Sequence, residues 1–254
     1  RVFLEVDRAY KEGANIIILS DRDVDEYHVT IPSLLAVSAV SQYLIRTKKS
    51  TALALILESA EPREVHHFAT LLGYGACAIN PYLAHETIGQ LIDEGLLDKD
   101  YYAAVQDYDN AILNGIVKIA SKMGISTIQS YQSSQIFEAV GLKKSFIDQY
   151  FTNTPSPVEG LDLFDVAGEA VTVHKRAFEA IERKVIPLAA GGQYMYRQGG
   201  EHHLWTPDAV VHLQRAVREG SWAEYQTYAG LINNQARDLL TIRGLFEFVP
   251  GKAI

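Results

Sequence analysis

The chain has 254 residues, of which 48% are hydrophobic and 21% charged, and its formal net charge is −8. These values are typical of a soluble globular protein with one large α/β domain or two smaller ones. Acidic and basic residues are interspersed, so we expect no nucleic-acid partner. The longest apolar runs are too short to span a bilayer, so we expect no membrane partner either.

The chain begins at Arg1 without a recognisable secretory signal and ends in "FEFVPGKAI" without a closing signal. We therefore expect a piece of a longer protein. Cys77 is the single cysteine, which excludes an internal disulfide and a cysteine-ligated iron–sulfur cluster within this chain. It stands among small and apolar residues with no base beside it, which favours a buried, inert thiol in a cytoplasmic protein.

Four short segments are predicted to be strands because they are apolar on both faces, as a covered parallel sheet requires. They span residues 16–20, 52–58, 77–80 and 126–130.

Helices are expected between these strands. Pro62 and Glu64 suit the first turn of a helix that Gly73 ends, and two further helices are expected over residues 110–123 and 133–140. Each strand–helix–strand unit has about thirty residues or more, the size of a βαβ unit. The expected class is therefore α/β, with a parallel sheet that is either part of a barrel or doubly wound.

The alternation of predicted strands and helices stops after Phe151, and this change predicts two domains. Residues 1–151 carry the βα repeats, whereas residues 152–254 show no βαβ pattern and are expected to form a helical and hairpin extension. Its expected parts are a long amphipathic helix over residues 161–183, a hairpin over residues 191–205 and helices that begin at Thr206 and Ser221.

Neither histidine pair fits a metal site. His66 and His67 would point about 100° apart on a helix, and His202 and His203 would face opposite sides of a strand. A packing or interface role is favoured for the first pair, and no metal site is expected at the second. The glycine pairs at 191–192 and 199–200 match no phosphate-binding motif, and turns explain them.

Polar clusters follow three of the predicted strands, at the edge where α/β sheets and barrels bind ligands. They are Ser20-Asp21-Arg22, Asn80-Pro81-Tyr82 and Gln129-Ser130-Tyr131. The clusters lack a nucleophile with its base, a Schiff-base lysine and a set of metal-binding carboxylates. A purely structural rim and a chemically active rim both remain open from the residues alone.

Several long segments resemble the central domain of the glutamate synthase large chain. They are "GANIIILSDR", "IPSLLAVSAV", "EPREVHHFATLLGYGACAINPYLAHETI", "KIASKMGISTIQSYQSSQIFEAVGL" and "YFTNTPS", followed more loosely by "GGQYMYRQGGEHHLWTPDAV". The resemblance implies a partial or degenerate (βα) barrel between a glutaminase domain and an FMN-binding domain with an iron–sulfur cluster. That family makes two glutamates from glutamine and 2-oxoglutarate, and its central domain helps to wall the ammonia tunnel.

The resemblance assigns no catalytic, cofactor-binding or metal-binding residue to this chain, and FMN and the cluster are expected elsewhere in the parent. It implies a cytoplasmic or plastid-stroma protein. The chain departs from the family at Ser41-Gln42-Tyr43, where histidines are common, at Gln132-Ser133-Ser134, where Arg-Gly-Ala is common, and at His85, where an aromatic is common. These changes bear on interdomain and tunnel contacts.

We therefore expect a scaffold that helps to line an ammonia tunnel, with small and polar side chains at the strand ends. The candidate rim or tunnel residues are Ser20, Asp21, Arg22, Ala78, Asn80, Tyr82, Ser126, Gln129 and Tyr131. One alternative is an independent flavin-binding (βα) oxidoreductase. Another is a non-catalytic homo-oligomerisation module that uses the aromatic tail around Trp205, Trp222, Tyr225 and Tyr228.

Overall fold

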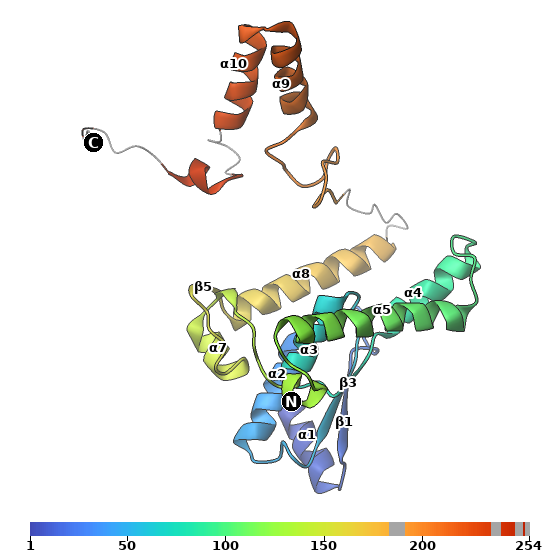
Figure 1. Ribbon diagram of the computed structural model, residues 1–254. Coiled ribbons are helices and arrows are strands. Elements are labelled where there is room, and N and C mark those ends of the chain that lie inside the picture. The colour runs from blue at the N-terminus through green and yellow to red at the C-terminus, as the bar shows by residue number, and fades with distance from the viewer. Residues whose placement is uncertain (183–190, 235–239, 247–250, 252–254) are drawn as a thin grey trace. The chain divides into compact units, whose positions relative to one another are not determined.

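The computed structural model describes residues 1–182, 191–234, 240–246 and 251. The chain divides into two compact units, Arg1–Arg183 and Lys184–Ile254 (Figure 1). Each unit is described by itself. The domain boundary expected after residue 151 falls inside the first unit and stays a prediction.

The first unit is built on a parallel sheet in the order β1-β2-β3. Its strands are β1 (Ile16–Ser20), β2 (Ala54–Glu58) and β3 (Ala78–Asn80), which confirms three of the predicted strands with small shifts at their starts. The helices between and before them are α1 (Val2–Lys11), α2 (Ser33–Arg46) and α3 (Val65–Gly73). Each crossover is helical, as parallel neighbours require.

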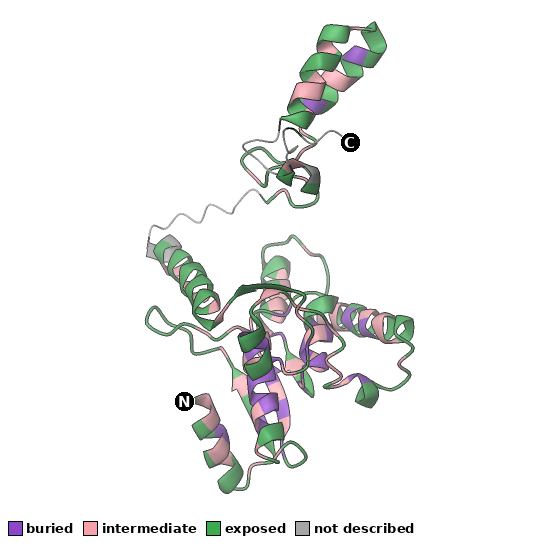
Figure 2. Cartoon of the chain, turned by 90° about the vertical axis from the view of Figure 1, so that its left-hand side faces the viewer, coloured by how far each residue is buried: buried purple, intermediate pink, exposed green. Residues whose placement is uncertain are grey.

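These three helices cover one face of the sheet. Ile17 and Leu55 pack with α1 and α2, while Leu57 packs with α2 and α3. Among the three, α2 carries the most buried residues (Figure 2). The sequential strand order with helices on one face is the winding of consecutive (βα)-barrel units, although the described residues do not close a barrel.

The opposite face of the sheet is open within the described residues, and here the expectation of strands buried on both faces is wrong. Ile16 and Ile18 of β1 are 54% and 62% exposed, while Ile17 between them is 8% exposed. Strand alternation explains the pattern, because successive side chains point to opposite faces and helices cover one of them. Cys77, just before β3, is also exposed rather than buried as expected.

The rest of the first unit is mostly helical. Its elements are α4 (Tyr82–Asp93), α5 (Tyr101–Lys122), α6 (Ile128–Tyr131), β4 (Val140–Leu142), α7 (Lys144–Tyr150), β5 (Val158–Leu161) and α8 (Leu163–Glu182). Strands β4 and β5 form a second, two-stranded parallel sheet. The expected helices that end near residues 122 and 182 are confirmed, although the first begins at Tyr101 and not near residue 110.

Two expectations between α5 and α7 are wrong. The predicted strand over residues 126–130 is replaced by the short helix α6, where the Thr127 and Ser130 hydroxyls bond locally at 2.9 Å. The predicted helix over residues 133–140 does not form, because Ser133 and Gln135 have positive φ values of 58° and 52°. Their backbone N–H groups instead bond to the carbonyls that end α3. Local capping bonds compete with regular structure in such serine- and threonine-rich segments.

The second unit contains α9 (Pro207–Glu219), α10 (Trp222–Asn233) and a 3-10 turn over Ile242–Leu245. The predicted helix starts are confirmed, since the Thr206 and Ser221 hydroxyls accept hydrogen bonds from N–H groups three residues later. The predicted hairpin is wrong, because residues 191–206 contain no strand. Tyr194 there is 94% exposed, and an isolated two-stranded hairpin without a packed face is only marginally stable.

Candidate functional site

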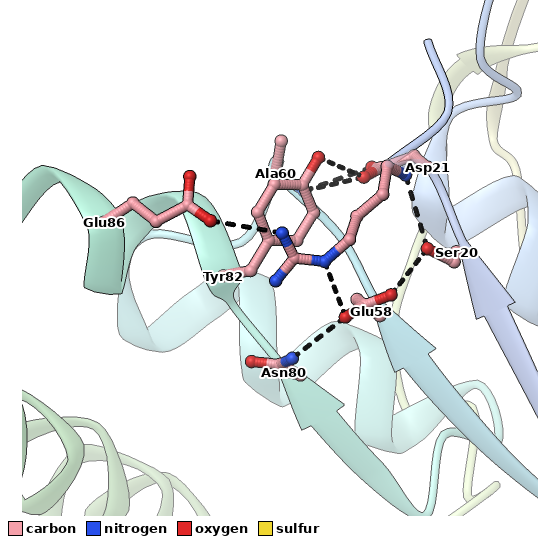
Figure 3. A network of polar contacts seen from close by, with 8 residues as sticks. Ser20, Asp21, Glu58, Ala60, Asn80, Tyr82 and Glu86 are labelled. Atoms are coloured by element: carbon pink, nitrogen blue, oxygen red, sulfur yellow. Dashed lines mark hydrogen bonds and ion pairs between the residues drawn. The ribbon is translucent and has the colours of Figure 1, made fainter.

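A polar network joins the carboxyl ends of the three main strands (Figure 3). Register places Ser20, Glu58 and Asn80 side by side, so their side chains share one face of the sheet. The Glu58 carboxylate accepts hydrogen bonds from the Ser20 hydroxyl at 2.7 Å and from Asn80 Nδ2 at 3.2 Å. Glu58 therefore ties β2 to both of its neighbouring strands.

Arg22 extends this network to α4. Its Nε donates to Glu58 Oε1 at 2.8 Å and one terminal nitrogen donates to Glu86 Oε1 at 3.1 Å. The guanidinium also lies 3.9 Å from the centre of the Tyr82 ring, which is a cation–π geometry. Hydrogen bonds from Arg22 and then from Ser20 hold the pKa of Glu58 below its ordinary value, and the bonds to Glu58 and Glu86 raise the pKa of Arg22.

Asp21 forms the second half of the network. Its carboxylate accepts hydrogen bonds from the Ser59 hydroxyl at 2.6 Å, from the Ala60 N–H at 3.1 Å and from the Tyr82 hydroxyl at 2.8 Å. Burial, followed by the hydrogen bond to Asp21, raises the pKa of Tyr82 to about 12. The Tyr82 phenol therefore stays neutral and keeps donating throughout the physiological pH range.

The network leaves few polar groups for other chemistry. Each of its charged side chains bonds to another member, and the Ser20 and Ser59 hydroxyls donate to the Glu58 and Asp21 carboxylates. Its physical effect is to fix the ends of β1 and β2 against α4. Arg22 and Glu86 are accessible to solvent, with side chains 44% and 58% exposed.

Five of the residues singled out from the sequence, Ser20, Asp21, Arg22, Asn80 and Tyr82, lie together in this network. Ala78 lies on the same face as Asn80, two residues earlier in β3. The remaining candidates do not follow a strand of the main sheet. They are Ser126, in the segment before α6, and Gln129 and Tyr131, within α6.

Sequence reasoning missed Glu58, Ser59 and Glu86. A signal for Glu58 existed, because it is the last residue of a predicted strand and therefore a register neighbour of Ser20 and Asn80. Glu86 lies one helical turn after Tyr82 on α4, and only the spatial meeting of α4 with the end of β1 reveals its role.

The open sheet face continues directly from the network. Ile18, Ile56 and Ala78 form the row next to Ser20, Glu58 and Asn80. The face therefore changes along the strands from aliphatic to polar.

A cavity of about 430 Å³ lies elsewhere in the first unit, between α2 and α8, and its lining is largely aliphatic.

Within the described residues, no group of three or more histidine, cysteine, aspartate or glutamate side chains is arranged to hold a metal ion. In the same part of the chain, no helix is both long and apolar enough to cross a bilayer.

Comparison with known proteins gives one family. The profile described as "Glutamate synthase central domain" matches residues 1–143. The chain is 45% identical to the glutamate synthase [NADPH] large chain of Bacillus subtilis, over 97% of this chain and 16% of that relative. It is 38% identical to the glutamate synthase [NADH] of Schizosaccharomyces pombe, over 98% of this chain and 12% of the relative.

A ferredoxin-dependent glutamate synthase of Pyropia yezoensis is 37% identical, over 93% of this chain and 16% of its own length. The chain thus spans less than a fifth of the length of each of these three relatives.

Proposed function

Because the chain belongs to the glutamate synthase central-domain family, we propose that it is a scaffold segment of a glutamate synthase large chain. The parent would make two glutamates from glutamine and 2-oxoglutarate. This segment would stand between the glutaminase and FMN-binding domains and help to wall the passage for ammonia. It would perform no catalysis of its own, and FMN and the iron–sulfur cluster would bind in other parts of the parent.

The open face of the main sheet is the observation that carries this proposal. Parallel sheets in folded proteins are almost always covered on both faces, yet Ile16 and Ile18 are 54% and 62% exposed here. A neighbouring part of the parent chain would cover this face. An aliphatic surface that ends in a fixed polar rim also suits a passage from which water is kept away.

The strand-end network supports a structural role. Catalytic groups need a free acceptor or donor directed at the substrate, whereas Asp21, Arg22 and Glu58 direct theirs at other members of the network. The network would hold the rim in shape while the neighbouring domains perform the chemistry. The sequential strand order favours a degenerate relative of a (βα) barrel, with residues 1–151 as its core and residues 152–254 leading toward the FMN-binding domain.

The complete parent enzyme provides the test. Replacing Ala78, an exposed residue of the open face, with tryptophan should obstruct the passage and raise the ratio of glutamine hydrolysed to glutamate formed. Ala103→Trp on the exposed side of α5 is a matched control that should leave the ratio unchanged. Ser126→Trp tests, in the same assay, the other residue that the sequence suggests as a lining residue of the passage. An unchanged ratio in Ala78→Trp would contradict the placement of the passage along this face.

A separate titration of the 254-residue chain with FMN tests the proposal that this segment does not itself bind the cofactor. We expect no saturable change in flavin fluorescence up to high micromolar FMN. Tight one-to-one binding would instead favour an independent flavin-binding protein.

A further inference from the structure

A second cavity, of about 350 Å³, opens beside the last residues of β3 and shares Asn80 with the strand-end network. It is bounded by α3, α4 and α5. Most of its lining is apolar and its polar groups are few, which is the usual composition of small-molecule sites. The lining residues are Phe68, Leu72, Ile79, Asn80, Pro81, His85, Asp109, Ile112, Leu113 and Ile116.

A histidine–aspartate pair marks this cavity. His85 Nε2 lies 3.1 Å from Asp109 Oδ1, and the His85 side chain is 22% exposed. The Tyr108 ring meets the imidazole edge-on at 5.8 Å, and the Tyr108 hydroxyl is itself anchored to the Arg63 carbonyl at 2.9 Å. The imidazole is therefore held in one orientation from two sides.

The contact between His85 and Asp109 determines which hydrogen-bonding groups of the cavity can face a ligand. A carboxylate only accepts, so His85 Nε2 donates to Asp109 Oδ1, and Asp109 remains an acceptor through its second oxygen. Asn80 Nδ2 donates to Glu58, which leaves the Asn80 carbonyl oxygen as a further acceptor. Acceptors therefore dominate, and Asp109 is the one charged residue in the lining.

We propose that this cavity binds a small amine, with the protonated amino group on Asp109 and an apolar body against Phe68 and Ile112. The acceptor-rich polar end and the negative charge of Asp109 disfavour carboxylates and phosphates. An aliphatic or aromatic body of a few carbon atoms matches the remainder of the lining. This binding activity stands apart from the scaffold role and does not depend on it.

The test compares two probes of similar size on the complete 254-residue chain. 2-Phenylethylamine should bind saturably, with a Kd of about 1 mM, and shift the backbone amide signals of His85 and Asp109 in NMR spectra. Phenylacetate, which carries a carboxylate in place of the amine, should bind at least about tenfold more weakly. Non-saturable binding of the amine, or equal affinity for both probes, would overturn the proposal.

Variants separate the cavity from general attraction to an acidic surface. Asp109→Asn should weaken amine binding by at least about tenfold. Asp107→Asn, which lies on the same helix and outside the lining, should leave it unchanged. Leu113→Trp should block the cavity from its exposed edge and serves as a second variant if Asp109→Asn folds poorly. Equal losses in Asp107→Asn and Asp109→Asn, or full binding in Leu113→Trp, would contradict the assignment.

Discussion

Arg22 lies two residues beyond the end of β1, and Glu58 is the last residue of β2. Arg22 Nε donates a hydrogen bond to Glu58 Oε1 at 2.8 Å. This contact joins two neighbouring strands through side chains at the point where their backbone pairing ends. Arg22 also contacts Glu86 and the Tyr82 ring, so a single guanidinium links the sheet to α4. Arg22 is therefore the side chain that connects the strand-end carboxylate of β2 to α4.

Removing that side chain should destabilise the first unit. Arg22→Ala leaves Glu58 and Glu86 without their cationic partner and Tyr82 without its cation–π contact. We expect a lower urea midpoint for the 254-residue chain, measured by circular dichroism. Arg8→Ala is the control, because Arg8 forms only an exposed pair with Glu12, and such pairs contribute little. Equal midpoints for the two variants would show that the network adds no stability.

The stability of the rim should depend on pH through Glu58. The pKa of this carboxyl lies below its ordinary value of 4.5 because Arg22 and Ser20 donate hydrogen bonds to it. A carboxyl with a lower pKa in the folded state contributes stability that is present above the unfolded pKa and lost as the pH falls through the folded value.

The difference in unfolding free energy between the wild type and Glu58→Gln should therefore be constant at neutral pH and shrink below about pH 4.5. Urea unfolding at a series of pH values between 3 and 7 measures it. A difference that stays constant across this range would contradict the assigned role of the ionised Glu58 carboxylate.

Tyr131 is a buried residue whose hydroxyl has no hydrogen-bond partner among the described residues. Tyr131→Phe should therefore leave the free energy of unfolding unchanged or raise it slightly. Tyr74→Phe is a matched comparison, since the Tyr74 hydroxyl is hydrogen-bonded to Thr154 at 2.7 Å, and its loss should cost about 1 kcal/mol. A similar loss for Tyr131→Phe would indicate that a bound water or a neighbouring part of the parent satisfies the Tyr131 hydroxyl.

The sequence predicts the main sheet well because the signals for β1, β2 and β3 are local apolar runs. It predicts the rim only in part. Ser20, Arg22 and Asn80 follow from their places at strand ends, whereas Glu86 depends on how α4 returns toward β1. The segment around Ile128 has strand-like composition, but no strand among the residues that the structure describes pairs with it, and local bonds make it a short helix instead. Whether such a segment forms a strand depends on a pairing partner that is distant in the sequence.

The exposed face of the main sheet gives the sharpest contrast between the chain alone and the chain within its proposed parent. Ile18 is 62% exposed and Leu57 is 3% exposed, although they lie on neighbouring strands. In the 254-residue chain, Leu57→Ala should cost about 2–5 kcal/mol because it leaves a cavity under α2 and α3. Ile18→Ala should cost less than about 1 kcal/mol, because little of its side chain is removed from water.

In the complete parent enzyme, Ile18→Ala should become costly if another part of the polypeptide packs on this face. Thermal unfolding of both proteins, each with and without the substitution, measures the change. We expect the effect of Ile18→Ala on Tm to grow in the parent, while Leu57→Ala stays damaging in both. If Ile18→Ala remains harmless in the parent, the face is open there as well, and the proposed packing of neighbouring domains against it is wrong.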